Sequence, residues 1–268
     1  MKLSIITVTY NNKAGLLRTA KSVAEQVFQD FEWLVVDGGS VDGSQDVLAE
    51  YAPIIAWSIS EPDCGIYDAM NKGLAMAQGD FVQFLNAGDS FLDQNVLAYV
   101  FSDKRLEDVN YGDQWCVHGE TLVEKRQYPP TMDLPFLFNA PLGHQATFIK
   151  TDLAKGHPYR TTFSISADRA LFLELYLSGA SFHYLGIPIV YFDADGIGSR
   201  EETREQRRQQ LDQIKKTLLP PPAIRDFEQL MKKAEGFDFV QRVLPLRWAY
   251  SFFKWLQKNT TSRWNRIL

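Results

Sequence analysis

Polar clusters follow three apolar runs in the first ninety residues, and each cluster contains side chains that can contact a ligand. They are Tyr10-Asn11-Asn12, Asp37-Gly38-Gly39-Ser40 and Asn86-Ala87-Gly88-Asp89. The carboxylate of Asp37 can accept the imide N–H of a uracil or the matching donors of another base, and glycines beside it let a ligand approach the backbone. Proteins hold Mg²⁺ or Mn²⁺ with one or two carboxylates plus substrate phosphates and waters, which Asp89 can supply in part. Ordinary turns are the alternative for both carboxylates.

These clusters need a sheet to position them, because the apolar run before each one has the composition of a buried strand. We expect strands over 2–10, 31–36, 54–59 and 81–85, with helices over 14–27, 46–51 and 67–77 between them. Strand–helix alternation at this spacing predicts right-handed βαβ units on a parallel sheet. The clusters then lie at the carboxyl ends of the first, second and fourth strands, where open α/β sheets bind ligands.

The second half of the chain has a less regular pattern. We expect a hairpin over 109–117 and 120–128, a strand over 146–149, a helix over 166–177, a strand region over 181–192 and a helix over 200–216. Pro220-Pro221-Pro222 then interrupts the helical spacing. The triplet is the best boundary candidate, which predicts one domain over 1–219 and a helical extension over 220–268.

Composition excludes several classes of protein. The 268 residues include 28 basic and 33 acidic side chains, so the net charge of −5 offers no global footprint of a nucleic-acid binder. The two cysteines, Cys64 and Cys116, have no metal-ligand spacing and are too few for a disulfide framework. The amino-terminal run is too short for a signal peptide, and no stretch of about 18 uninterrupted apolar residues occurs. A cytosolic enzyme is the default expectation.

Four motifs together resemble the family 2 glycosyltransferases, which have the GT-A fold. They are Thr7-Val8-Thr9-Tyr10-Asn11, Val35-Val36-Asp37-Gly38-Gly39-Ser40 with Asp42-Gly43-Ser44, Phe84-Leu85-Asn86-Ala87-Gly88-Asp89, and the segment Asp63 to Gly73 (DCGIYDAMNKG). The last segment resembles a sub-group that builds bacterial surface polysaccharides. The resemblance covers roughly the first 200 residues and implies a Rossmann-like, mixed but mostly parallel sheet flanked by helices.

The resemblance also implies roles for individual residues on the donor side. Thr9, Tyr10, Asn11, Asp37, Lys72 and Asn86 would bind the nucleotide, and Asp89 would bind Mn²⁺ or Mg²⁺ together with the donor diphosphate. The family's Asp-x-Asp metal motif is reduced here, because Asn86 and Gly88 stand at its leading positions. For Lys72 the alternative is an ordinary ion pair with Asp68, four residues earlier on a helix.

On the acceptor side, the stretch Phe163 to Phe172 resembles the one in which this family carries its catalytic aspartate. Asp168 is therefore the expected base, which takes the proton of the acceptor hydroxyl as that oxygen attacks the anomeric carbon. A helix-start aspartate favoured by the macrodipole is the alternative. Gly143-His144-Gln145 recurs in related sequences, which implies acceptor binding by His144 and Gln145. A hydrogen-bonded structural histidine is the alternative for His144.

The last thirty residues, 239–268, contain six basic side chains, no acidic one and several aromatic ones. Basic and aromatic residues on short helices fit a segment that lies in a membrane interface, where anionic lipid adds about 1 kcal/mol per Lys or Arg. A carboxyl-terminal helix packed on the catalytic domain is the alternative. A nucleic-acid patch explains the segment less well, since no recognised module accompanies it.

The expected activity is an inverting, metal-dependent transfer of a sugar from a nucleotide donor, with UDP as the expected nucleotide, to a hydroxyl of a lipid-linked saccharide. The expected place is the cytoplasmic face of a bacterial membrane, and the inverting outcome comes from the resemblance. A sugar nucleotidyltransferase is one alternative, although Asn11-Asn12-Lys13 replaces its glycine-rich signature. A dinucleotide oxidoreductase lacks its Gly-x-Gly-x-x-Gly motif. A catalytically silent sugar-nucleotide binder or scaffold is the third alternative, supported by the reduced metal motif.

Overall fold

The structure is a computed structural model that describes residues 1–119, 121–194, 196, 201–226 and 228–229. The Cα positions divide the chain into two compact units, Met1–Ile214 and Lys215–Leu268. The first unit holds a nine-stranded mixed sheet with the strand order β3-β2-β1-β4-β8-β6-β9-β5, and β7 pairs with β6 outside this path. The predicted α/β architecture is confirmed.

Four parallel strands form the first half of the sheet. They are β1 (Leu3–Thr9), β2 (Phe31–Asp37), β3 (Ile55–Ser60) and β4 (Phe81–Phe84). Every residue of β1 and β4 is buried, as expected for strands covered on both faces. The register places Thr9 opposite Asp37, and Asp37 opposite Ser60. The carboxyl ends of these three neighbouring strands therefore lie side by side.

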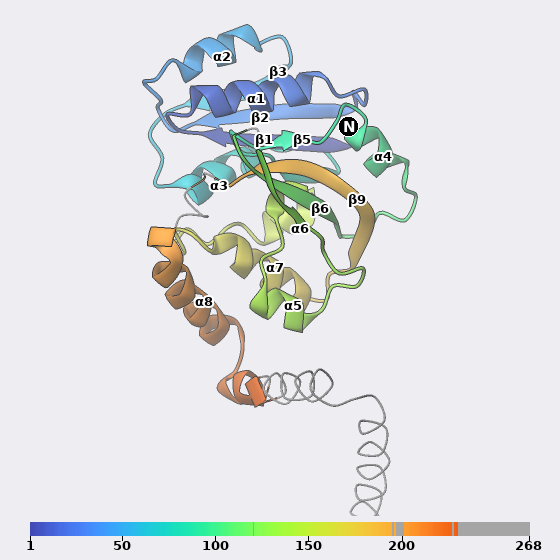
Figure 1. Ribbon diagram of the computed structural model, residues 1–268, viewed down its shortest axis with the longest axis vertical. Helices are drawn as coiled ribbons and strands as arrows, with labels where there is room; N and C mark the ends of the chain where they lie inside the picture. The colour runs from blue at the N-terminus through green and yellow to red at the C-terminus, as the bar shows by residue number, and fades with distance from the viewer. Residues whose placement is uncertain (120, 195, 197–200, 227, 230–268) are drawn as a thin grey trace, which may run out of the picture. The chain divides into compact units, whose positions relative to one another are not determined.

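Three helices connect these strands, namely α1 (Lys13–Ala24), α2 (Ser44–Glu50) and α3 (Ile66–Met76). Figure 1 shows α1 and α2 over one face of the sheet and α3 over the other. The apolar stripe of α1, with Leu16, Ala20 and Val23, is fully buried in the core against strand residues such as Trp33. These crossovers bring the start of each helix to the carboxyl end of the strand before it.

The second half of the sheet is mixed. It contains β5 (Ser90–Phe91), β6 (Val109–His118), β7 (Thr121–Arg126), β8 (Thr147–Lys150) and β9 (Phe182–Asp193). Strand β8 is antiparallel to both β4 and β6, whereas the long strand β9 runs parallel to β6 and antiparallel to β5. The one-turn 3₁₀ helix η1 (His144–Ala146) precedes β8, and α7 (Ala167–Leu177) precedes β9.

The strands and helices expected up to residue 216 are all present, and the last of these helices crosses the boundary between the two units. The elements without an expectation are short: β5, α4 (Val96–Ser102), α5 (Leu134–Asn139) and α6 (Thr151–Gly156). A helix of six or seven residues spans fewer than two turns and does not establish a helical period. Such elements are stabilised by tertiary packing, as the burial of Leu97 and Phe138 illustrates.

Helix α8 (Arg204–Leu218) follows the 3₁₀ helix η3 (Glu201–Thr203) and ends before Pro220. The division between the two units falls at Ile214–Lys215, within α8, so the boundary at residue 220 stays a prediction. The basic and aromatic segment 239–268 lies outside the described residues. In the described part of the chain, no helix has both the length and the hydropathy needed to cross a bilayer.

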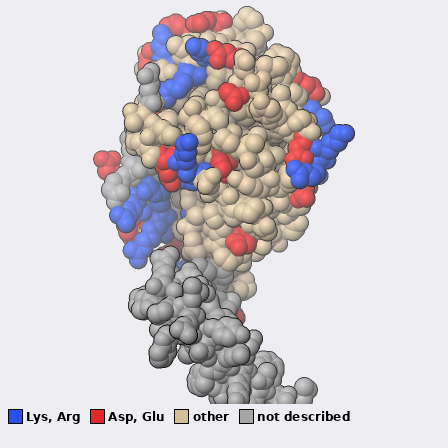
Figure 2. Space-filling view, turned by 45° about the vertical axis from the view of Figure 1, so that its right-hand side comes forward, with Lys and Arg blue, Asp and Glu red and all other residues tan. Residues whose placement is uncertain are grey.

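Charged side chains are distributed over the surface in small groups. In the view of Figure 2, Lys and Arg of the described residues lie mostly beside Asp and Glu rather than in one broad basic face. Among the ion pairs of the described residues are Lys2–Asp80 and Lys150–Asp108, at 3.1 and 2.9 Å. The expectation, from net charge, that the protein is not a nucleic-acid binder stays a prediction.

Candidate active site

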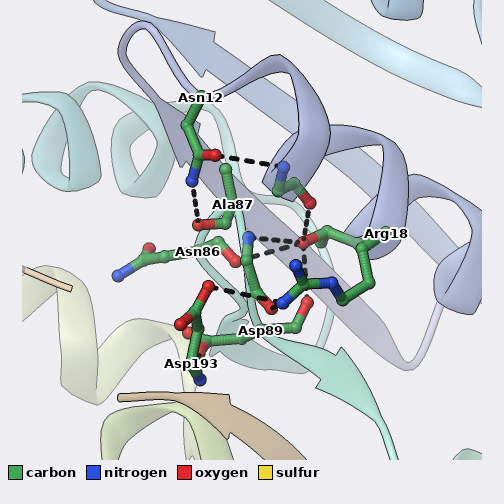
Figure 3. Close-up of polar contacts among 9 residues, drawn as sticks. Asn12, Arg18, Asn86, Ala87, Asp89 and Asp193 are labelled. Atoms are coloured by element: carbon green, nitrogen blue, oxygen red, sulfur yellow. Dashed lines mark hydrogen bonds and ion pairs between the residues drawn. The ribbon is translucent and has the colours of Figure 1, made fainter. Parts of the chain in front are cut away.

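The turn Asn86–Asp89 follows β4 and is clamped to α1, as Figure 3 shows. The side chain of Asn12 caps α1 by accepting from Gly15 N at 3.0 Å, and its amide nitrogen donates to Ala87 O at 3.1 Å. The hydroxyl of Thr19 donates to Asp89 O at 2.6 Å and accepts from Gly88 N at 3.1 Å. Helix α1 therefore fixes the backbone of this turn, whose Gly88 has a φ of +112°.

Asp89 is almost fully buried beneath this turn, with 4% of its surface exposed. Its Oδ1 accepts the backbone N–H of Asp193, at the end of β9, at 2.9 Å. Burial raises the pKa of Asp89 to about 7, the N–H of Asp193 opposes that increase and the Asp193 charge adds to it. The carboxylates of Asp89 and Asp193, 104 residues apart in the sequence, thus act on one another.

The donor set around Asp89 fits a hard divalent cation. Within the described part of the chain no cluster of three or more His, Cys, Asp or Glu side chains forms a metal site. Asp89 and Asp193 nevertheless supply two carboxylates, and the charge of Asp193 acts on that of Asp89. Mg²⁺ and Mn²⁺ accept such sparse oxygen sets when a diphosphate completes the coordination.

Arg18 contacts the same turn from α1. Its guanidinium donates to Gly88 O at 3.2 Å and lies 3.3 Å from Asp193 Oδ2 (Figure 3). Neither Arg18 nor Asp193 was among the site residues expected from sequence. Local sequence patterns do not reveal Asp193, because its proximity to Asp89 depends on the pairing of β9 with β5 across the fold.

His144 lies between this turn and the expected base. It is 9% exposed, and its Nε2 lies 3.1 Å from Asn86 Nδ2. Its Nδ1 has no hydrogen bond and faces Asp168 Oδ2 at 3.8 Å. Gln145, beside it, is also buried, and its backbone carbonyl accepts from Gln83 Nε2 on β4 at 2.6 Å. Helix η1 is thereby fixed against the end of β4.

Asp168 lies in the first turn of α7, the location that the macrodipole favours for an acid. Its Oδ1 accepts from Arg169 N at 2.9 Å. The hydroxyl of Tyr67 lies 3.3 Å from Asp168 Oδ1 and 2.8 Å from Ile165 O, and its single proton can be donated to one of them at a time. Burial raises the pKa of Tyr67 well above its usual value, so this hydroxyl stays a donor at neutral pH. Tyr67 belongs to the motif 63–73, although sequence reasoning assigned it no role. Five predicted residues are thus brought together: Asn86, Asp89, His144, Gln145 and Asp168.

Thr9, Tyr10, Asn11 and Asp37 lie at the neighbouring ends of β1 and β2, in different environments. Thr9 is buried with an unpartnered hydroxyl, whereas Tyr10 is 66% exposed. Asn11, with a φ of +48°, joins two loops because its N–H donates to Ser40 Oγ at 2.7 Å and its Oδ1 accepts from Val41 N at 2.9 Å. Asp37 is fully buried and accepts from Ser40 and Ser60.

Lys72 lies on α3 and is held by acidic side chains. Its ammonium is 2.8 Å from Glu61 Oε1 and 3.7 Å from Asp68 Oδ2. The hydrogen bond from Lys72 to Glu61 raises the pKa of Lys72, so the group stays charged. The i,i+4 ion pair considered from the sequence is therefore present, and the diphosphate contact of Lys72 stays a prediction.

Comparison with known proteins agrees with this geometry. Residues 4–162 match the family model "Glycosyl transferase family 2". The chain belongs to glycosyltransferase family 2 and is a transferase. An uncharacterized glycosyltransferase of Mycobacterium tuberculosis is 33% identical over 210 residues, which cover 75% of this chain and 78% of the relative. A "PGL/p-HBAD biosynthesis glycosyltransferase" of Mycobacterium bovis is 34% identical over 173 residues, 62% of this chain and 66% of the relative.

Solved glycosyltransferase structures share the fold. Staphylococcus aureus TarS (residues 1–349) bound to UDP superposes with a TM-score of 0.61 and 22% identity, over 72% of this chain and 60% of that one. A Pyrobaculum calidifontis mannosyltransferase in complex with GDP-Man and Mn²⁺ has a TM-score of 0.51 and 20% identity, over 70% of this chain and 55% of that one. The matched part of this chain thus spans about three fifths of the TarS structure. The predicted GT-A fold is confirmed.

Proposed function

We propose that this glycosyltransferase transfers a sugar from a UDP-sugar to a hydroxyl of a lipid-linked saccharide in the synthesis of a bacterial surface polysaccharide. The arrangement that carries the proposal is the contact chain Asn86–His144–Asp168, with distances of 3.1 and 3.8 Å. It joins the turn expected to hold the donor diphosphate to the carboxylate expected to act on the acceptor. The printed names of its relatives and neighbours, with PGL biosynthesis and UDP complexes among them, support the substrate classes.

Asp168 is the proposed base of a single displacement with inversion. Its carboxylate removes the proton from the acceptor hydroxyl as that oxygen forms the new bond to the anomeric carbon, and the bond to the nucleoside diphosphate breaks on the opposite face. The backbone N–H of Arg169 holds Oδ1, which leaves Oδ2 to accept the proton beside His144. His144 and Gln145 line the acceptor side in this proposal.

Asp89 and Asp193 are the residues that would hold a Mn²⁺ or Mg²⁺ ion, with Asn86 on the nucleotide side. Such an ion, when bound, offsets the negative charge that develops on the departing diphosphate. Asn12 and Thr19 hold the backbone of the turn 86–89 in place. The proposed nucleotide side is formed by the residues at the ends of β1 and β2 together with one on α3: Thr9, Tyr10, Asn11, Asp37 and Lys72. Arg18, whose guanidinium contacts Gly88 O, adds a positive charge beside the turn.

We also propose that the enzyme works at the cytoplasmic face of a bacterial membrane and attaches through residues 239–268. The support is their composition, with six basic side chains, no acidic one and interleaved aromatic residues. A chain that ends at residue 238 should lose most of its binding to vesicles that contain anionic phosphatidylglycerol, measured by co-sedimentation. Equal sedimentation of the full and shortened chains would contradict this attachment.

The donor class is tested by thermal stabilisation of the full chain with UDP-, GDP- and dTDP-sugars in the presence of Mn²⁺. A ligand that binds only the native state raises the unfolding temperature by mass action. We expect the largest increase with a UDP-sugar, and release of UDP when a lipid-linked saccharide is added. Stabilisation by none of these nucleotide sugars would contradict the proposed function.

A further inference from the structure

The turn that leads into α7 is held from outside by helix α8. Gln210, on α8, accepts the backbone N–H groups of Ile165 and Ser166 through Oε1, both at 3.1 Å. Its amide nitrogen donates to Ser164 Oγ at 3.0 Å, and Gln206 donates to the same hydroxyl at 3.1 Å. The two glutamines are four residues apart and therefore lie on one face of α8. That face fixes three consecutive residues of the turn.

Ser166, the second of the residues whose N–H groups Gln210 accepts, is where α7 begins. It is the N-cap residue, and serine commonly caps a helix with its own hydroxyl. Here its side chain makes no capping hydrogen bond, although the residue is only 4% exposed. Its backbone carbonyl accepts from Arg169 N at 3.1 Å and from Ala170 N at 3.3 Å. The first turn of α7 is thus built on the backbone that Gln210 holds.

Asp168 lies in this first turn, two residues after Ser166. The turn is also held from the other side of its backbone, because the hydroxyl of Tyr67 on α3 lies 2.8 Å from the carbonyl oxygen of Ile165. The peptide groups just before the expected base therefore contact α3 through a carbonyl and α8 through two N–H groups. The direction in which Asp168 points follows from where these two helices hold the turn.

Helix α8 has few apolar means of attachment. Among its residues Arg204–Leu218, Ile214 is the buried one, so the glutamines provide much of the directional contact with the turn. A backbone N–H that loses its partner has to find another acceptor or water. Without the carbonyl oxygen of Gln210, the N–H groups of Ile165 and Ser166 would turn to water, and the start of α7 would be free to shift.

We propose that Gln210 is a positioning residue of the transfer reaction, which fixes the start of α7 and thereby places Asp168 Oδ2 for the acceptor hydroxyl. The inference rests on the proposed function, in which Asp168 is the base. A general base acts only within hydrogen-bond reach of the proton that it takes, and a displacement of about 1 Å can lower a rate by about 10². Gln210 acts through the backbone of Ile165 and Ser166, so its role needs no contact with a substrate.

The test compares Gln210→Ala with Gln209→Ala in the full chain. Gln209 is the neighbouring glutamine on α8, is exposed and donates to Glu205 of the same helix at 3.2 Å. Initial rates use the UDP-sugar that stabilises the chain most and a polyprenyl-diphosphate saccharide as acceptor. We expect kcat of Gln210→Ala to fall by about tenfold, with UDP affinity within about twofold of wild type. Gln209→Ala should match wild type in both.

A conservative variant and a second background separate positioning from a general loss of stability. Gln210→Glu keeps an acceptor oxygen for both N–H groups and should retain kcat within about threefold of wild type. In Asp168→Asn no base remains to be placed, so adding Gln210→Ala should lower the residual rate by less than about twofold.

Hydrogen exchange followed by mass spectrometry gives a readout that needs no substrate. Peptides that cover 163–170 should exchange faster in Gln210→Ala than in wild type, whereas peptides that cover β1 should exchange at the wild-type rate. Unchanged exchange over 163–170 would overturn the inference, because the turn would then be held without Gln210.

The rate measurements distinguish this inference from the proposed function. Wild-type kcat in Gln210→Ala, together with a loss in Asp168→Asn, would overturn the inference and leave the proposed function in place. An equal loss from Gln210→Ala in the wild-type and Asp168→Asn backgrounds would assign the effect to stability and overturn it as well. Transfer by Asp168→Asn at the wild-type rate would contradict the proposed base, and the inference with it.

Discussion

His144 Nδ1 lies 3.8 Å from Asp168 Oδ2, and the other ring nitrogen, Nε2, lies 3.1 Å from Asn86 Nδ2. The amide nitrogen of Asn86 can only donate, so Nε2 accepts and the neutral ring carries its proton on Nδ1. That N–H points toward the carboxylate. One imidazole thus connects the turn at the end of β4 with the first turn of α7, two segments about eighty residues apart in sequence.

Replacing His144 with Gln tests this connection. The variant removes the ring nitrogen that faces Asp168 Oδ2 at 3.8 Å, an electrostatic contact that a shift of the acceptor-side groups can shorten to a hydrogen bond during the reaction. We expect kcat to fall by about tenfold or more while UDP affinity stays within about twofold of wild type. Steady-state rates and nucleotide titration measure the two quantities.

The matched control for this variant is His157→Gln. His157 lies just after α6, where its Nδ1 is 3.0 Å from Leu153 O, and it has no contact with the site. It should leave kcat unchanged. A loss of UDP affinity in His144→Gln as large as its loss of kcat would contradict a role on the acceptor side.

Asp89 is the second residue to test, through the response to metal. In Asp89→Asn the amide oxygen still accepts the N–H of Asp193, so the fold is conserved while one charge is lost. Wild type should bind UDP more tightly with Mn²⁺ than without it, and the variant should show little difference between the two conditions. Calorimetric titration of UDP with and without Mn²⁺ measures the effect. An equal Mn²⁺ enhancement in both proteins would refute the metal role.

Replacing Asn12 with Ala should lower the thermal stability of the protein and also weaken its binding of the donor. Substitution with Ala removes the cap of α1, at about 1 kcal/mol, and releases the hydrogen bond to Ala87 O. We expect Tm to fall by about 2–4 °C and the KM for the donor to rise, measured by calorimetry and initial rates. Asn95→Ala is the control, since Asn95 precedes α4 without a side-chain cap. A similar rise in KM in both variants would contradict a role for the Asn12–Ala87 hydrogen bond in donor binding.

Asp108 provides a pH-dependent contribution to stability. Hydrogen bonds from Ser181 N and from the Lys150 ammonium, with a further one from Ser181 Oγ, lower the pKa of Asp108 to about 2. A carboxyl with a lowered folded pKa stabilises the protein above its unfolded pKa of about 4, and this stability is lost as pH falls from about 4 to about 2. Because the side chain is 33% exposed, solvent screening reduces the contribution to about 1 kcal/mol.

The measurement is the free energy of unfolding of wild type and Asp108→Asn by urea at several pH values. The variant should be less stable by about 1 kcal/mol at pH 6, and the difference should vanish near pH 2. Asp152→Asn, an exposed position on α6, should follow the wild-type curve. A difference for Asp108→Asn that persists unchanged at pH 2 would contradict this origin.

Much of the first half of the fold was predictable because its signals are local. The β-branched run at β1 and the spacing of Leu16, Ala20 and Val23 on α1 each identify one element, and alternation of such elements dictates a parallel sheet. Helix α5 shows the limit of this reasoning. It contains six residues whose apolar side chains have no visible period, and Phe138 is buried only because α7 packs nearby.

The site was predictable in part for the same reason. Asn86 and Asp89 follow a strand, and Asp168 starts a helix, which local patterns reveal. Asp193 was not predictable, because it reaches Asp89 only through the long strand β9 and its pairing with β5. Nor does the sequence show that Asp37 is buried, since its surroundings include Ser60 from the neighbouring strand as well as the nearby Ser40.

The role of Asp168 as the base is the central claim, and the variant Asp168→Asn tests it most directly. Initial rates of sugar transfer from a UDP-sugar to a lipid-linked saccharide should fall by about 10²–10⁴, because the amide cannot take the hydroxyl proton. The dissociation constant for UDP with Mn²⁺, measured on the same preparation, should stay at the wild-type value. Transfer by Asp168→Asn at the wild-type rate would contradict the account.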